Sequence, residues 1–185
     1  MHEEVIFAGF GGQGVLSMGQ VLCYSGMIEE REVCWMPSYG PEMRGGTANC
    51  IVTVSDKEIS SPIIGRFDTV VALNQPSLDK FEGAVKPGGT LIYDSTNIID
   101  PPKRTDIDIV PIPASEEAVK LKNTKIMNMI VLGAFLAKKE TVQVDTVLKA
   151  LKTVLPERHH HLIPLNETAL KRGKELALSP EPATA

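Results

Sequence analysis

Aromatic residues are scarce in this sequence of 185 residues, and it has no excess of positive charge. Phe, Trp and Tyr make up only 5% of the chain, which leaves few side chains on which bases could stack. The formal net charge is −4 and no basic face stands out, so we expect no nucleic-acid partner. With 43% apolar and 23% charged residues, the composition is otherwise that of an ordinary globular protein.

Recognisable metal-binding and nucleophile patterns are absent as well. The three cysteines are Cys23, Cys34 and Cys50. None of them forms the C-x-x-C pair that is common in structural zinc sites and iron–sulfur clusters, so we interpret them as small buried apolar residues in a reducing compartment. No Ser lies in a G-x-S-x-G pattern and no Cys has a clear base partner. We therefore expect no catalytic residue and no metal ligand in this chain.

Long hydrophobic runs do not occur either. The longest apolar stretch, residues 126–137, is shorter than a membrane span requires and contains Asn128, which we interpret as a hydrogen-bonded packing or interface residue. The first residues lack the basic and apolar regions of a signal peptide. These features predict a cytoplasmic protein without a membrane partner.

Three consecutive histidines are a further candidate for a metal site. His159, His160 and His161 are neighbours in sequence and cannot all face one ion without strain. We interpret them as surface or interface residues.

Short apolar runs alternate with helix-like segments, which predicts an α/β fold. We expect strands at residues 5–8, 33–36, 48–54, 69–73, 90–93 and 108–112, with a turn at 86–89 and a loop at 37–46. The second half carries more helical pattern. The sequence therefore predicts a three-layer α/β/α Rossmann-like domain with a mostly parallel sheet and a more helical C-terminal part. A single domain is expected over residues 1–178, followed by a flexible tail over 179–185.

Helix starts are predicted from capping residues. We expect a first helix over residues 12–27, a helix whose first turn contains Pro76, and one over 144–155 with a single apolar face. Ser115 is followed by two acidic residues and is predicted to cap another helix. Asn166 is predicted to cap the final one.

The turn between the first strand and the first helix is rich in glycine. Its residues are Gly9, Gly11, Gly12, Gln13 and Gly14. The spacing fits G-x-G-x-x-G, in which glycines allow a sharp turn and a close approach of backbone N–H groups to a ligand. A dinucleotide site would also place an acid at the end of the second strand, but residues 33–37 contain none. A tight turn without a ligand, and a loop that offers its N–H groups to a phosphate or a partner chain, both stay open.

Residues 37–49 form a second unusual segment. It is longer than most connections, is stiffened by Pro37 and Pro41, and carries Tyr39, Glu42 and Arg44. Rigid polar loops on an α/β scaffold usually carry function. Two glycines follow Arg44, so its guanidinium could reach a carboxylate or phosphate in a bidentate manner. The alternative is a Glu42–Arg44 pair that only stiffens the loop.

With these motifs together, the chain resembles the gamma subunit of the 2-oxoacid:ferredoxin oxidoreductases, most closely the 2-oxoglutarate:acceptor branch. The resemblance spans residues 5–173. It is carried by residues 9–14, 38–49 and 74–78, with weaker support from 128–134 and 158–166. It implies one gamma-type domain of the pyruvate/ketoisovalerate oxidoreductase kind.

The resemblance implies an accessory subunit rather than a catalytic one. Enzymes of this family decarboxylate a 2-oxoacid on thiamine diphosphate, pass electrons through iron–sulfur clusters to a ferredoxin-type acceptor, and transfer the acyl group to coenzyme A. The implied partners are alpha and beta chains, with or without a delta chain, and this chain alone is expected to bind none of these cofactors. The expected ligand- or interface-binding residues are Gly9, Gly11, Gly12, Gln13, Gly14, Ser38, Tyr39, Glu42, Arg44, Gly45, Gly46, Thr47 and Asn74.

Residues 38–47 are hypothesised to dock against the catalytic chains and to shape the approach of substrate or coenzyme A. The glycine loop is expected at the same edge of the sheet, because the carboxyl ends of parallel strands share one crevice. Two rival functions stay open, a stand-alone nucleotide-binding oxidoreductase and a purely structural assembly subunit.

Overall fold

The computed structural model describes residues 1–39, 47–61 and 63–178 of the chain. Within these residues the chain forms a six-stranded sheet with the order β2-β3-β1-β4-β5-β6. The strands are β1 (His2–Phe10), β2 (Glu32–Tyr39), β3 (Thr47–Ser55), β4 (Phe67–Ala72), β5 (Val85–Asp94) and β6 (Asp108–Ile112). β1, β4, β5 and β6 pair in parallel, whereas β3 is antiparallel to both of its neighbours. The predicted mostly parallel sheet is therefore confirmed.

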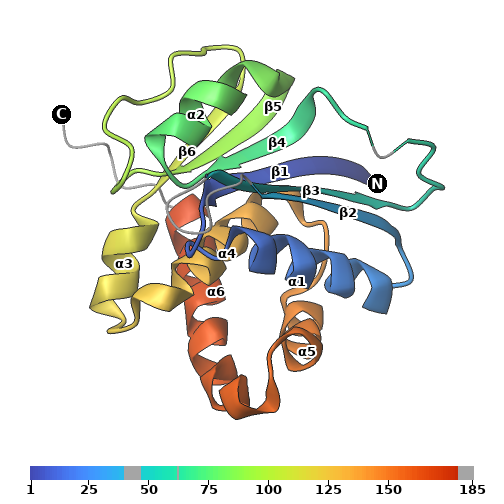
Figure 1. Ribbon diagram of the computed structural model, residues 1–185, viewed down its shortest axis with the longest axis vertical. Coiled ribbons are helices and arrows are strands. Elements are labelled where there is room, and N and C mark those ends of the chain that lie inside the picture. The colour runs from blue at the N-terminus through green and yellow to red at the C-terminus, as the bar shows by residue number, and fades with distance from the viewer. Residues whose placement is uncertain (40–46, 62, 179–185) are drawn as a thin grey trace.

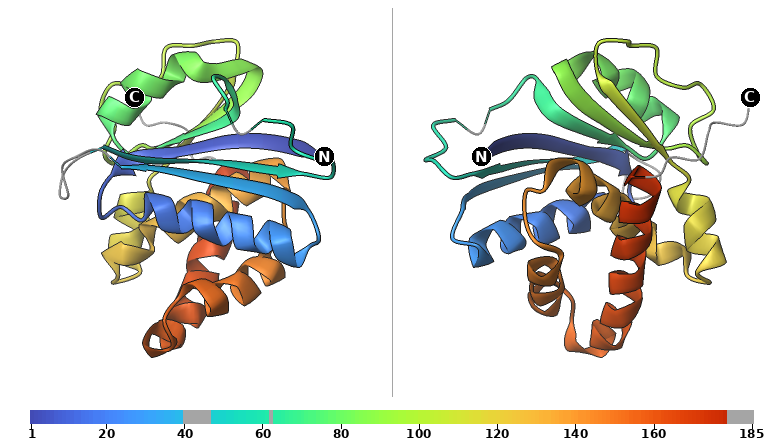
Figure 2. Two further views of the ribbon diagram at one scale, coloured as in Figure 1. Left: turned by 45° about the vertical axis from the view of Figure 1, so that its right-hand side comes forward. Right: turned by 180° about the vertical axis from the view of Figure 1, so that it is seen from behind.

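Helices cover the two faces of this sheet unequally. They are α1 (Val15–Ile28), α2 (Gln75–Phe81), α3 (Ala114–Lys120), α4 (Met127–Lys139), α5 (Val144–Val154) and α6 (Ile163–Leu178), with short 3₁₀ helices at Glu82–Ala84, Thr124–Ile126 and Glu157–Leu162. Figure 1 shows α2 above the sheet and α1, α4 and α6 below it, and the side view in Figure 2 shows the same layers. The three-layer architecture and the more helical second half are confirmed.

Two apolar cores follow from the alternation of side chains along the strands. Val5 and Phe7 of β1 face the larger core beneath the sheet, where the ring of Phe7 packs edge-on against Phe135 of α4 with centroids 5.8 Å apart. Ile6, between them, faces the smaller core under α2 together with Leu78. Both cores rigidly support β1, whose carboxyl end carries the glycine loop.

The backbones of α4 and α6 touch at two glycines. A Cβ atom on Gly133 would overlap the carbonyl oxygen of Leu170, and one on Gly173 would overlap that of Ile130. Only glycine permits this approach, because any larger residue would force the helices apart. The crossing fixes the position of α4, and the first turn of α4 reaches the glycine loop.

The predicted loop over residues 37–46 is wrong at its start. β2 extends to Tyr39, and Pro37 and Ser38 pair with Cys50 and Asn49 of β3. β2 is an edge strand, where proline is tolerated since one side needs no ladder hydrogen bond. Residues 40–46 lie outside the described residues, as does the tail predicted over 179–185.

The turn predicted at residues 86–89 lies inside β5 instead of preceding it. The pairing of β4 with β5 shifts register between Phe67–Val85 and Thr69–Thr90, and Gly88 has a φ of 73°. The glycine pair thus forms an irregularity in the strand rather than a connection between two elements.

Two predicted helix caps are also wrong. α3 begins at Ala114 with Pro113 at the N-cap, and the Ser115 hydroxyl donates to Asp94 at the end of β5. α6 begins at Ile163, so Asn166 lies within the helix, where its Nδ2 donates to the carbonyl of Leu162. In each case the polar side chain binds a partner other than the N-terminal N–H groups of the helix that it was predicted to cap.

Candidate functional site

The ends of β1, β2 and β4 and the start of β3 lie at one edge of the sheet. Phe10 at the end of β1 pairs with Thr47 at the start of β3, and Tyr39 at the end of β2 pairs with Ala48. The neighbouring strand β4 ends at Ala72, which pairs with Ala8. The β1–α1 loop, the paired ends of β2 and β3 and the β4–α2 turn are therefore neighbours.

This edge contains the topological switch point of the sheet. After β1 the chain enters α1 on one face, and after β4 it enters α2 on the opposite face (Figure 1). In open α/β sheets, ligands bind in the crevice at such a point, outside the carboxyl ends of the strands. The side chains that line the gap between β1 and β4 therefore decide what this edge can bind.

Glycines shape the loop for reasons of packing and of backbone conformation. Gly14 is the N-cap of α1 with a φ of 75°, and a Cβ atom there would lie 2.5 Å from Nδ2 of Asn128. A Cβ atom on Gly9 would lie 2.7 Å from Oε1 of Gln13. Gly12 also has a positive φ, 98°, but open space surrounds it. The helix starts at Val15, later than predicted, because these positive φ values are not helical.

Gln13 fills the gap between the ends of β1 and β4. Its Oε1 accepts hydrogen bonds from the backbone N–H of Phe10, at 2.6 Å, and from Nδ2 of Asn74, at 3.3 Å. Its Nε2 donates to the carbonyl oxygen of Leu73, at 3.2 Å. One amide side chain thus joins the ends of β1 and β4, and its partner Leu73 lies 60 residues from it in the sequence.

Asn74 belongs to the same network and is 4% exposed. Its Oδ1 accepts a hydrogen bond from the backbone N–H of Ser77 at 2.9 Å, so it caps α2, and Pro76 lies in the first turn as predicted. From the opposite side, Nδ2 of Asn128 lies 3.4 Å from the carbonyl oxygen of Gly14. The interpretation of Asn128 as a hydrogen-bonded packing residue is confirmed.

The outward side of the edge is formed by other predicted residues. Gly12, Ser38 and Thr47 are exposed and Gly11 is half-buried. Only the backbone pairing of Tyr39 is described, and Glu42, Arg44, Gly45 and Gly46 lie outside the described residues. The charged part of the predicted site stays a prediction.

The described residues offer no fit for a metal or cluster. Among residues 1–39, 47–61 and 63–178, no group of three or more His, Cys, Asp and Glu could hold a metal ion. Burial raises the pKa of Cys50 to about 12, and its thiol donates to the carbonyl oxygen of Val15. Burial also raises the pKa of Cys23.

Asp94 is a polar residue at this edge that the sequence analysis did not single out. It follows the apolar run of β5 and is fully buried. Its carboxylate accepts hydrogen bonds from the Asn97 side chain at 2.8 Å and from the Ser115 hydroxyl. An acid directly after a buried strand was the available signal. Like Gln13, it satisfies its hydrogen bonds inside the chain and closes a strand end.

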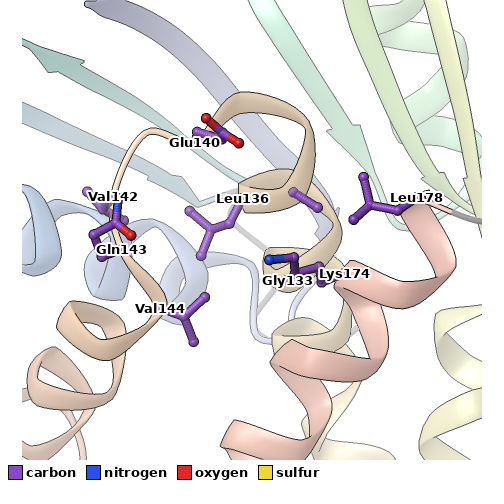
Figure 3. A pocket seen from close by; sticks show the side chains of 9 residues that line it. Gly133, Leu136, Glu140, Val142, Gln143, Val144, Lys174 and Leu178 are labelled. Atoms are coloured by element: carbon purple, nitrogen blue, oxygen red, sulfur yellow. The ribbon is translucent and has the colours of Figure 1, made fainter.

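A cavity of about 370 Å³ lies far from this edge, at the other end of α4 (Figure 3). Leu136, Val142, Val144 and Leu178 line it, and Lys174 stands at its wall. None of the residues predicted as a site contributes to it. No helix within the described ranges is long and apolar enough to cross a membrane.

Comparison with known proteins decides the family. The family model described as pyruvate ferredoxin/flavodoxin oxidoreductase matches residues 4–176. The chain belongs to this family. The prediction made from the motifs is thereby confirmed.

Two relatives differ in how much of them the chain covers. The 2-oxoglutarate synthase subunit KorC of Methanothermobacter marburgensis is 33% identical over 96% of this chain and 98% of its own length. The ketoisovalerate oxidoreductase subunit VorA of the same organism is 44% identical over 72% of this chain but only 28% of its own length. The chain therefore spans less than a third of the length of VorA.

Two solved structures share the fold. The gamma subunit of a keto/oxoacid ferredoxin oxidoreductase from Geobacter sulfurreducens is 28% identical, with a TM-score of 0.81 over 95% of this chain and 98% of that one. The 2-oxoglutarate:ferredoxin oxidoreductase from Magnetococcus marinus has a TM-score of 0.88 at 24% identity, covering 98% of this chain and 32% of that one. The latter was solved with 2-oxoglutarate, coenzyme A and succinyl-CoA bound.

Proposed function

We propose that the chain is the gamma subunit of a cytoplasmic 2-oxoacid:ferredoxin oxidoreductase, which oxidatively decarboxylates a 2-oxoacid to its acyl-coenzyme A. The observation that carries this proposal is the near full-length correspondence with a 2-oxoglutarate synthase subunit. That relative is a separate subunit of similar extent, so 2-oxoglutarate is the proposed substrate of the complex. The partners are alpha and beta chains, with or without a delta chain, and a ferredoxin-type acceptor. The chain acts as one domain over residues 1–178.

The cofactors of this complex belong to its other chains. Thiamine diphosphate supplies an electron sink for the carbanion formed on decarboxylation, and iron–sulfur clusters carry the electrons. The described residues of this chain supply no cluster ligands. Its contribution is therefore binding and orientation at the edge that holds the glycine loop.

The edge surface, defined as Gly11, Gly12, Ser38 and Thr47, faces an anionic group of the assembled enzyme. α1 begins directly behind this loop without an acidic residue in its first turn, so its positive end favours a carboxylate or phosphate there. Residues 38–47 dock against the catalytic chains, and Arg44 supplies the charge that such a group requires. The anion is the carboxylate of the oxoacid or a phosphate of coenzyme A.

Replacement of Arg44 by Ala tests the edge surface. Turnover or assembly is expected to fall about tenfold or more, because charge-assisted hydrogen bonds are worth about 1.5–3 kcal/mol, while the melting temperature of the subunit stays unchanged. The control is Arg66→Ala, since Arg66 is exposed and lies at the start of β4, at the opposite edge of the sheet. Unchanged kinetics and unchanged assembly for Arg44→Ala would remove this role and favour a purely structural subunit.

The proposed activity is tested by reconstitution with the candidate partner chains. Coenzyme A-dependent reduction of a viologen dye is measured with 2-oxoglutarate, pyruvate and 2-oxoisovalerate, and 2-oxoglutarate is expected to give the highest kcat/KM. NAD(P) is titrated into the isolated chain in parallel. Binding of NAD(P) together with no oxoacid-dependent activity would replace the proposal by the stand-alone nucleotide-binding function.

A further inference from the structure

The orientation of the Gln13 amide is fixed by its partners. The N–H of Phe10 requires an acceptor, and the carbonyl of Leu73 requires a donor, so Oε1 must face Phe10 and Nε2 must face Leu73. A flipped amide would oppose donor to donor and acceptor to acceptor. Gln13 therefore has one arrangement in which all of its hydrogen bonds are made.

Asn74 is oriented by the same reasoning. Its Oδ1 is used by the N–H of Ser77 at the start of α2, which leaves Nδ2 to donate to Gln13. The two amides thus form a continuous chain of hydrogen bonds from the backbone of β1 to the cap of α2. The arrangement ties the glycine loop to an element on the opposite face of the sheet.

The glycine loop is held from both faces. Asn74 reaches it from the α2 side through Gln13, and Asn128 of α4 reaches the carbonyl of Gly14 from the other side. The lack of a side chain on Gly9 leaves room for Oε1 of Gln13. The crevice at the switch point is therefore occupied by a side chain of the protein itself.

We propose that Gln13 is a positioning residue that, with Asn74, holds Gly11 and Gly12 in the single conformation that the loop uses in the assembled enzyme. This inference rests on the proposed function, in which the edge surface meets an anion. Gln13 and Asn74 then do not touch that anion, because their amides bind inside the chain. They act through the loop backbone, and a displaced loop weakens binding of the anion.

Gln13→Met removes the three hydrogen bonds and keeps the volume of the side chain. In the full-length chain, amide exchange of Phe10 is expected to accelerate about fivefold, the effect of losing one hydrogen bond of ordinary strength. The matched control is Gln75→Met. Gln75 also makes three hydrogen bonds, but to Asp79 and Asp100 rather than to the glycine loop. It should leave the exchange of Phe10 unchanged.

Kinetics of the assembled complex separate positioning from mere structural support. For Gln13→Met the KM for one ligand is expected to rise roughly tenfold, with kcat within about twofold of wild type and the complex intact. A rise in KM for coenzyme A identifies a phosphate as the anion, and a rise in KM for the oxoacid identifies a carboxylate. Unchanged KM values for both ligands overturn the proposal.

Asn74→Ser keeps the test valid if Gln13→Met fails to fold. Serine retains the cap of α2 but cannot reach Gln13, so the melting temperature should be preserved while exchange of Gln13 and its neighbours accelerates. Unaltered exchange in the full-length chain also overturns the proposal, whatever the activity of the complex. An inactive wild-type complex, by contrast, counts against the proposed function and leaves the exchange test standing.

Discussion

Gly14 combines two constraints at one residue. Its φ is 75°, and a Cβ atom there would meet the side chain of Asn128. Gly14→Ala is therefore expected to lower the free energy of unfolding by about 2–4 kcal/mol, as the sum of left-handed strain and overpacking. Denaturant unfolding measures this loss.

Gly12→Ala is the matched control, because Gly12 has a φ of 98° but nothing within 4 Å of an added Cβ atom. It should cost only about 1–2 kcal/mol, from the backbone alone. Equal losses for the two variants would show that the contact with Asn128 does not constrain the loop.

Glu3 is a buried carboxyl group whose ionised form is disfavoured. Burial raises its pKa above the ordinary value of 4.5, although the Thr69 hydroxyl donates to it and Lys139 lies 3.9 Å away. A raised pKa in the folded state means that ionisation costs stability above the ordinary pKa. Glu3→Gln should therefore be more stable than wild type at pH 7, and the difference should shrink as the pH falls through the raised pKa and be absent below 4.5. Urea unfolding across this range checks both points.

The stability contributed by the ion pair between α3 and α6 is expected to depend on pH in the opposite direction. Glu117 of α3 accepts hydrogen bonds from Arg172 of α6 at 2.6 Å and from Lys120 at 2.7 Å, and these cations lower its pKa below 4.5. Its contribution is present above the ordinary pKa and is lost as the pH falls through the lowered one. Glu117→Gln should lose about 1 kcal/mol at pH 7, since solvent screens the half-exposed Arg172, and nothing at low pH. A loss independent of pH would contradict this ion-pair role.

The crossing of α4 and α6 depends on the absence of two side chains. Gly173→Ala would place a methyl group against the backbone of Ile130, and we expect a loss of at least about 3 kcal/mol in denaturant unfolding. Gly83→Ala, where an added Cβ meets nothing within 4 Å, is the control and should change stability little. A small loss for Gly173→Ala would show that the helices can separate at no cost.

The strands and the longer helices were predictable because their patterns are local. Apolar runs and a glycine turn identify β1, β4 and β6 within a few residues, and the apolar face of α5 repeats every three or four residues. Pro37 and Ser38 gave no strand signal, because both are rare in strands and only an edge position tolerates them. Ser115 was misread because its partner, Asp94, lies 21 residues away in sequence.

The sequence predicted where in the sheet the candidate site residues lie better than it predicted what each of their side chains contacts. The glycine spacing and the polar segment over residues 37–49 pointed to the edge of the sheet where β1 and β2 end. The sequence grouped Gln13 and Asn74 with the ligand- or interface-binding residues, but their hydrogen bonds run inside the chain. Such pairings depend on contacts across 60 or more residues, which no local pattern contains.

At the scale of the whole molecule, the fold is a Rossmann-like sheet in which side chains of the protein itself fill the switch point. Gln13 and Asn74 fill the gap between β1 and β4, and Asp94 closes the end of β5. The edge surface that remains for contacts consists of Gly11, Gly12, Ser38 and Thr47. This arrangement supports the proposal that the subunit presents a preformed surface to partner chains.

Native purification of the chain from its source, with mass spectrometry of the proteins that accompany it, tests the central claim most directly. The account predicts that thiamine- and cluster-bearing chains co-purify and that the preparation reduces a dye only with both a 2-oxoacid and coenzyme A. A chain that purifies alone, or a preparation without this activity, would contradict the account.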